Sequence, residues 1–80
     1  MTVELSKKAA KILLAQPQKT QERIAAAIRE IPQGDIKPLQ GSPDSFRLRV
    51  GGWRVTFSYP AKDVILVEKI KPRGGAYKGA

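Results

Sequence analysis

The stretch FRLRVGGWRVTFSY, residues 46–59, constrains the fold more than any other part of this sequence. Its apolar and polar residues alternate, as in a strand with one buried face, and Gly51-Gly52 is a two-residue hairpin signal. A slip of one residue would bury the arginines, so the pattern fixes the register. Such a hairpin places three apolar cross-strand pairs on one face: Val50 with Trp53, Leu48 with Val55, and Phe46 with Phe57.

The other face of the predicted hairpin is basic. Arg47 lies opposite Thr56, and Arg49 lies opposite Arg54. Like charges in directly opposite positions destabilise a sheet. The arginines could splay apart into water, or they could hold an anion, because a guanidinium binds two phosphate oxygens at once. The nearest acidic residues are expected in the flanking loops, at Asp44 and Asp63.

The rest of the chain predicts an α+β fold, with two N-terminal helices packed on a small, mainly antiparallel sheet in the order β-α-α-β-β-β. Residues 2–5 are expected to form a strand, and Ser6 to cap a helix over residues 7–16. A second helix is expected from Pro17 to Ile31, where an apolar stripe at helical spacing ends before Pro32.

Two further segments complete this prediction. Residues 34–45 hold two prolines, two glycines and two aspartates and are expected to form a connecting loop. YPAKD, residues 59–63, is expected to form a turn, and VILVEKI, residues 64–70, a third strand after the loop. The apolar run without alternation in this strand is typical of a strand covered on both faces at its start. Residues 1–80 are expected to form one domain.

Composition narrows the class of function. The net charge is +8, and it is spread as +3 over residues 1–34, +2 over 35–59 and +3 over 60–80. An evenly basic small domain suits a polyanionic partner, nucleic acid before a membrane surface. The chain has no cysteine and no histidine, and its seven acidic residues show no ligand cluster. This disfavours a metal-dependent nuclease and removes the usual general base.

Basic residues continue along the last predicted strand and beyond it. Lys69, Lys71 and Arg73 follow one another at a spacing of two, and Tyr77 follows four residues later. Guanidinium groups can hold a phosphate, while an aromatic ring can stack on a base or transfer a proton. Tyr77 could equally be a packing residue near the terminus.

The segments LQGSPDSFRLRVGGWRVTFSY, residues 39–59, and VILVEKIKPRGGAYK, residues 64–78, resemble the RelE/ParE toxin superfamily. The preceding order of strand, helix and helix fits as well. The resemblance implies a RelE-like toxin of a type II toxin–antitoxin system, an endoribonuclease that inhibits translation by cutting messenger RNA in the ribosomal A site. There a ribose 2′-OH attacks the adjacent phosphate, which requires a base, cations for the transition state and an acid for the leaving oxygen.

The resemblance also implies roles for individual residues of this chain. The expected catalytic residues are Arg49, Arg54, Arg73 and Tyr77, and the expected RNA-binding residues are Arg47, Lys69, Lys71 and Lys78. Some family members have lysine where this chain has arginine on the first hairpin strand. An arginine that stays protonated is a poor base, so Tyr77 is the first candidate for the base and Lys71 the second.

Two alternatives remain at this stage. The chain could resemble the ParE branch, which inhibits DNA gyrase and cleaves nothing, although that branch usually lacks the cationic set with a tyrosine. It could also be a non-toxic basic nucleic-acid-binding module, for which the supply of exposed aromatic residues is small, with Tyr77 and Tyr59 as candidates.

The toxin hypothesis carries expectations about partners and location. A cognate antitoxin is expected to present an acidic or amphipathic segment that wraps the helices or covers the arginines, and the ribosome with its messenger RNA is the expected target. No metal and no small-molecule cofactor is expected. No apolar run approaches the ~20 residues of a membrane span, and the N-terminus shows no secretory signal, so a cytoplasmic protein is expected.

Overall fold

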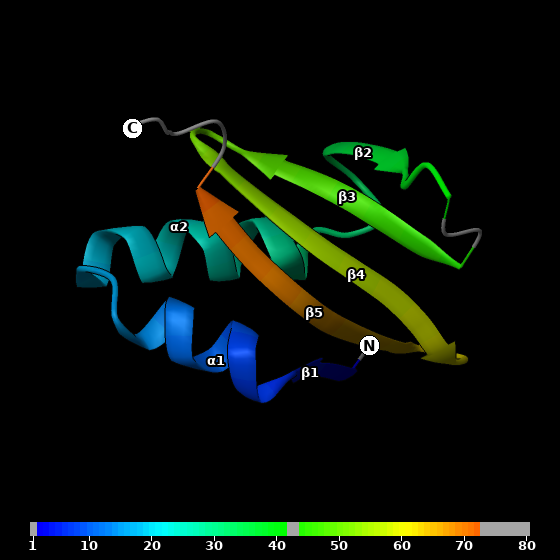
Figure 1. The fold of residues 1–80 in the computed structure, drawn as a ribbon, viewed down its shortest axis with the longest axis horizontal. Helices are drawn as coiled ribbons and strands as arrows, with labels where there is room; N and C mark the ends of the chain where they lie inside the picture. The colour runs from blue at the N-terminus through cyan, green and yellow to red at the C-terminus, as the bar shows by residue number, and fades with distance from the viewer. Residues whose placement is uncertain (1, 42–43, 73–80) are drawn as a thin grey trace.

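The computed structural model describes residues 2–41 and 44–72. It shows two helices and a five-stranded sheet with the strand order β1-β5-β4-β3-β2 (Figure 1). The β1–β5 pair is parallel, and the other neighbouring strands are antiparallel. The predicted α+β class is therefore confirmed. The elements are β1 (Thr2–Leu5), α1 (Lys7–Leu14), α2 (Gln18–Arg29), β2 (Asp35–Pro38), β3 (Ser45–Val50), β4 (Trp53–Ala61) and β5 (Val64–Pro72).

The helices begin close to where the sequence predicts. Ser6 caps α1, because its hydroxyl accepts a hydrogen bond from the Ala9 amide at 3.0 Å. Pro17 is the N-cap residue of α2, and no side chain caps the start of this helix with a hydrogen bond. Both helices lie on the same face of the sheet (Figure 1). The buried apolar residues they contribute are Ala9, Leu13, Ile24 and Ile28.

The β3–β4 hairpin has the predicted register, with Val50 opposite Trp53 and Arg49 opposite Arg54. Gly51 has φ +56° whereas Gly52 has no positive φ, which is the pattern of a type II′ turn. A Cβ on Gly51 would lie 2.8 Å from the guanidinium of Arg23 on α2, which could move aside, so it is the positive φ that favours glycine here.

One strand was missed by the sequence analysis. Residues 34–45 are not simply a connecting loop, because β2 within this segment pairs with β3 along its whole length. The strand has four residues and ends at Pro38, as is typical of an edge strand. The density of proline and glycine concealed a short alternation, in which Ile36 packs against the core between the polar Asp35 and Lys37.

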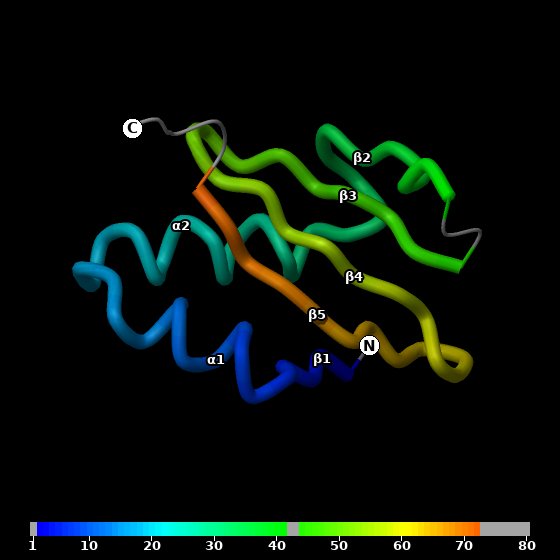
Figure 2. Tube along the Cα trace, in the orientation of Figure 1, coloured from blue at the N-terminus to red at the C-terminus, as the bar shows by residue number. Residues whose placement is uncertain are grey.

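The β4–β5 hairpin is longer than predicted (Figure 2). β4 runs through Pro60 to Ala61, so the expected five-residue turn shrinks to Lys62 and Asp63. Pro60 is tolerated because the ladder shifts register between Ser58 and Ala61, and a β-bulge needs no regular donor there.

The core lies between the helices and one face of the sheet. Its largest fully buried side chains are Phe57, Ile24, Leu48, Ile65, Val55 and Val67. At the start of β5 the expectation of cover on both faces is wrong, because Val64 and Leu66 are only half-buried opposite the helices. In the part of the chain that the structure describes, no helix is long and apolar enough to span a membrane.

Candidate phosphate-binding face

The face of the sheet opposite the helices carries polar side chains in two rows that cross four strands. The first row runs from β2 to β5 through Asp35, Arg49, Arg54 and Lys71. The second row runs through Lys37, Arg47, Thr56 and Lys69. Each row follows from the strand register, because residues paired across neighbouring strands point to the same side. We call these two rows the cationic face.

Arg49 lies beside an acidic residue that was not predicted to be its neighbour. Its Nε lies 3.8 Å from Oδ2 of Asp35 on β2. Both side chains are about half exposed, so the pair adds little stability. Its consequence is that a carboxylate lies beside the guanidinium of Arg49, in the same row as Arg54. The expectation that the nearest acids lie in the flanking loops is wrong, because Asp35 lies on β2, directly opposite Arg49.

Arg54 stands between two other cations. Its cross-strand neighbours are Arg49 on β3 and Lys71 on β5. Within residues 2–41 and 44–72, the Arg49–Asp35 contact is the ion pair that the structure contains, so Arg54 has no carboxylate partner there. An exposed guanidinium flanked by two positive charges favours an anion in the first row.

Arg47 contributes a half-buried guanidinium from the second row. Its Nε is buried and makes no hydrogen bond to any described protein atom. Buried polar atoms normally have a partner, so this N–H is an unsatisfied donor among the described residues. Beside it lies a hollow of about 380 Å³. The hollow is lined by Lys37, Pro38, Leu39, Gln40, Arg47 and Arg54.

The carboxylate of Glu68 borders the cationic face. Glu68 is the extra residue of a bulge in β5, between the pairs Thr56–Lys69 and Phe57–Val67. It accepts hydrogen bonds from the hydroxyls of Ser58 at 3.1 Å and Ser45 at 3.4 Å. No three acidic side chains come together as a metal site in the described ranges.

The predicted site residues divide into two groups. Arg47, Arg49, Arg54, Lys69 and Lys71 lie together in the two rows. Arg73, Tyr77 and Lys78 lie outside the described residues. Lys37 and Asp35 also lie in the rows and were not predicted, although the alternation Asp35-Ile36-Lys37 indicates a strand that carries them.

Tyr59, a candidate for base stacking, lies elsewhere. Its ring packs edge-on against Phe46 and Phe57, with 5.6 Å between ring centroids in each case. Both phenylalanines pack with the core under the helices. Tyr59 therefore belongs to the helix side of the sheet, and the described part of the cationic face holds no aromatic side chain.

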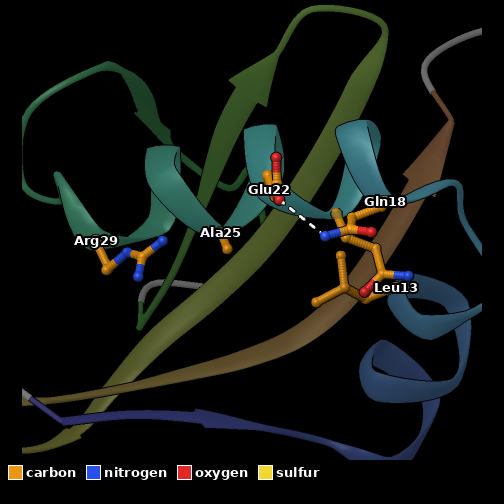
Figure 3. Close-up of a pocket in the computed structure, with 6 residues that line it drawn as sticks. Leu13, Gln18, Glu22, Ala25 and Arg29 are labelled. Atoms are coloured by element: carbon orange, nitrogen blue, oxygen red, sulfur yellow. Dashed lines mark hydrogen bonds between the residues drawn. The ribbon is translucent and has the colours of Figure 1, made fainter.

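The helix side has a hollow of its own. It measures about 390 Å³ and lies between Leu13 of α1 and the outer side of α2 (Figure 3). Gln18 reaches along α2 to Glu22 with a hydrogen bond of 3.2 Å, and Arg29 lies at the far end. An adjoining hollow of about 230 Å³ is lined by Val3, Leu5, Leu13, Ala25, Ile28 and Arg29.

Comparison with known proteins gives a consistent set of relatives. No family model matches the chain. A curated protein of Methanocaldococcus jannaschii that carries the name RelE1 is 44% identical over 45 residues, which are 55% of this chain. The chain thus spans about half, 50%, of the length of that relative.

Among the solved structures that match along nearly the whole chain, two are described here. A chain of the archaeal RelE–RelB complex from Pyrococcus horikoshii is 32% identical, with a TM-score of 0.72 and coverage of 94% of this chain and 97% of that one. The isolated RelE toxin of E. coli is 17% identical, with a TM-score of 0.76 and coverage of 94% and 86%, and supports the fold alone.

Proposed function

This chain belongs to the RelE-like toxin superfamily, and from that premise we propose that it is the toxin of a type II toxin–antitoxin system. We propose that it cuts messenger RNA in the ribosomal A site without a metal ion. The observation that carries the proposal is the first cationic row, in which Arg49, Arg54 and Lys71 stand side by side on three adjacent strands.

The proposed reaction is attack by a ribose 2′-OH on the adjacent phosphate, with loss of the 5′ oxygen of the next nucleotide. The P–O bond to the 2′ oxygen forms while the P–O bond to the 5′ oxygen breaks. Negative charge on the phosphate oxygens is largest in the transition state, where fixed cations lower its energy. Arg49 and Arg54 are the proposed clamp, and Arg73 is proposed to complete it.

The second row has a separate part in this proposal. Arg47 and Lys37 border a hollow wide enough for a phosphate group and open to the first row through Arg54. Arg47 would donate from its guanidinium to a phosphate oxygen of a neighbouring nucleotide in this hollow. Lys69, and Lys78 beyond the described residues, are proposed to bind RNA through their charge, and Lys71 is proposed to bind RNA as well.

Proton transfer falls to residues other than arginine. The 2′-OH must lose a proton and the leaving oxygen must gain one, and a guanidinium does neither readily. Tyr77 remains the first candidate for the base and Lys71 the second. Lys71 is supported by its position directly opposite Arg54.

A translation reaction tests the activity. Purified protein is added to ribosomes with a defined messenger, and the 3′ ends of the fragments are mapped. We expect cuts at A-site codons, no cutting of naked RNA and loss of the cuts in Arg54→Ala. Lys62→Ala, in the exposed β4–β5 turn, is the matched control that should cut normally.

Two outcomes would contradict this proposal. Intact messenger together with inhibited supercoiling by DNA gyrase would indicate a ParE-like toxin. Cleavage that survives Arg54→Ala combined with Arg73→Ala would contradict the site even if the activity proved correct.

A cognate antitoxin is the proposed partner. The Pyrococcus horikoshii relative was solved as a RelE–RelB complex. In this chain, the exposed Val3 and Leu5 border the apolar hollow beside α2, which suits an apolar segment of such a partner. Expression of the chain alone should stop growth, and expression of the Arg54→Ala variant should not.

A further inference from the structure

The bulge in β5 brings a carboxylate to the side of the sheet that carries the arginines. One oxygen of Glu68 accepts a hydrogen bond from the hydroxyl of Ser58 at 3.1 Å, and the other accepts from the hydroxyl of Ser45 at 3.4 Å. The two serines are paired across β3 and β4, two residues beyond Arg47 and Thr56 of the second row. Because alternate residues of a strand point to the same side, these side chains lie on the side of the cationic face. We call Ser45, Ser58 and Glu68 the acceptor cluster.

The acceptor cluster has hydrogen-bond acceptors to offer and no spare donor. A serine hydroxyl has one proton, and both serines donate theirs to Glu68. A carboxylate only accepts. The three side chains are half-buried, so a ligand can still reach their remaining lone pairs. A ligand of this cluster must therefore present donors.

The negative charge of Glu68 also selects the kind of ligand. No cation of residues 2–41 or 44–72 forms an ion pair with this carboxylate, although cations lie in the neighbouring rows. A phosphate group is negative and carries only acceptors, so the acceptor cluster repels it. The donors of an RNA strand are the N–H groups of its bases and its ribose 2′-OH groups. Within a bound RNA, the cluster therefore suits a nucleoside and not the phosphate backbone.

The position of the acceptor cluster fits a nucleotide near the cleaved bond. The strand rise puts the cluster about 7 Å from the second row and about 13 Å from the first. A nucleotide whose phosphate lies in the hollow beside Arg47 can therefore bring the edge of its base to Glu68 while the cleaved phosphate lies between Arg49 and Arg54.

The chemistry of the four bases decides which base fits. Guanine presents two adjacent donors, N1–H and the 2-amino group, which match the two oxygens of one carboxylate. Adenine and cytosine each place an acceptor nitrogen beside their amino group, and uracil places its N–H between two carbonyls. Those acceptors would face an oxygen of Glu68. A pair of hydrogen bonds to a charged acceptor is strong and fixes the geometry, so guanine is the base that this cluster favours.

We infer that Glu68 selects a guanine close to the cleaved phosphate by accepting hydrogen bonds from its N1–H and 2-amino groups, while Ser45 and Ser58 hold the carboxylate for this contact. The inference rests on the proposed function, because it requires an RNA strand across the cationic face. It adds a preference for sequence, which the lysines and arginines do not supply when they bind the backbone.

The test measures binding to the full chain and does not depend on cleavage. Labelled oligouridines carry one central guanosine, inosine or adenosine, and fluorescence anisotropy at low salt gives the dissociation constants. Inosine keeps N1–H and lacks the 2-amino group, so it removes one of the two donors. We expect guanosine to be bound about tenfold more tightly than adenosine, with inosine between them.

Glu68→Gln should abolish the preference for guanosine, because the amide replaces one of the two acceptors with a donor. It should at the same time tighten binding of the adenosine oligonucleotide, since a negative charge is lost. Glu30→Gln makes the same chemical change at an exposed residue that follows α2 and should keep the full preference. Circular dichroism would confirm that the variants fold.

A double variant tests the two serines and is independent of the folding of Glu68→Gln. Ser45→Ala with Ser58→Ala keeps the carboxylate and removes both hydroxyls that hold it. The preference for guanosine over adenosine should fall from about tenfold to about threefold or less. An unchanged preference in this variant would overturn the role of the serines.

Three results would overturn the selection of guanine by Glu68. Equal binding of the guanosine and adenosine oligonucleotides by the unaltered chain would show that the face binds the backbone alone. A preference that survives Glu68→Gln would place base recognition elsewhere, and an equal loss in Glu30→Gln would show an effect of net charge. Failure of the proposed function gives a different pattern: intact messenger in the translation reaction, together with a Glu68-dependent preference for guanosine, would support guanine recognition and contradict cleavage.

Discussion

The two faces of the sheet are built from the same strands and follow opposite rules. On the helix side, Phe57 and Val55 are fully buried and pack with α1 and α2. On the other side, Arg54 and Thr56 alternate with them along β4 and no described element covers them. The first face stabilises the fold through its buried apolar side chains. On the second face Arg49 lies opposite Arg54, and this pair of like charges destabilises the fold.

This difference explains why a small domain tolerates opposed arginines. Burial of the apolar face contributes about 25 cal/mol per Å², whereas an exposed like-charge pair across two strands destabilises by about 0.2–1 kcal/mol. The repulsion between the arginines is therefore small compared with the free energy that burial of the core contributes. A bound anion would remove this repulsion. Neighbouring residues on each strand point to opposite faces, so one residue contributes to the core and the next is free to bind an anion.

Phe57→Ala should produce the largest effect and should act through the covered face. Loss of this fully buried ring is expected to lower the free energy of unfolding by about 3–5 kcal/mol, because a cavity remains beneath the helices. Urea denaturation followed by circular dichroism measures the change.

The matched control for Phe57→Ala is Thr56→Ala, one residue earlier on the opposite face. It should change the free energy of unfolding by less than about 1 kcal/mol. Similar losses in both variants would show that the two faces do not differ in the way we describe.

The covered face was predictable from the sequence because its signal is local. Alternation around Gly51-Gly52 fixes both the strands and their register, and Ser6 marks the start of α1 without further information. Each of these features depends on residues within a few positions of one another, and each was confirmed.

The cationic face was only partly predictable, because it combines strands that are distant in the sequence. Arg49 and Arg54 came from one hairpin, but Asp35 and Lys37 came from an edge strand of four residues inside a segment rich in proline and glycine. Edge strands have weak patterns, since only one neighbour and one buried side chain define them. The pairing of Lys71 with Arg54 required knowing the bulge at Glu68.

Arg54→Thr should change the free energy of unfolding in the opposite direction from Phe57→Ala, because it acts on the cationic face. Removal of the repulsion with Arg49 and Lys71 should raise the free energy of unfolding by a few tenths of a kcal/mol. The same change should lower the proposed cleavage about a hundredfold or more, because a transition-state cation is lost.

The separation of the two readouts makes the Arg54→Thr experiment decisive. Denaturation and the translation reaction are measured on the same preparation. A variant that lost both stability and cleavage would show that Arg54 is a structural residue. Unchanged cleavage with raised stability would remove Arg54 from the proposed clamp.

Asp35→Asn should have the smallest effect, and it tests how β2 serves the cationic face. The substitution keeps the shape of the side chain and removes the carboxylate charge beside Arg49. The free energy of unfolding should change by less than about 1 kcal/mol, because the ion pair is exposed. If Asp35 orients Arg49, kcat for the proposed cleavage should fall about threefold to tenfold.

The Michaelis constant distinguishes orientation from simple electrostatics in this variant. Loss of a negative charge makes the face more positive, so RNA binding should stay the same or tighten while kcat falls. Asp63→Asn makes the same chemical change in the β4–β5 turn, away from any ion pair among the described residues, and should leave both constants unchanged. An Asp35→Asn variant with unchanged kcat would show that Arg49 needs no anchor, and that β2 contributes Lys37 alone to the cationic face.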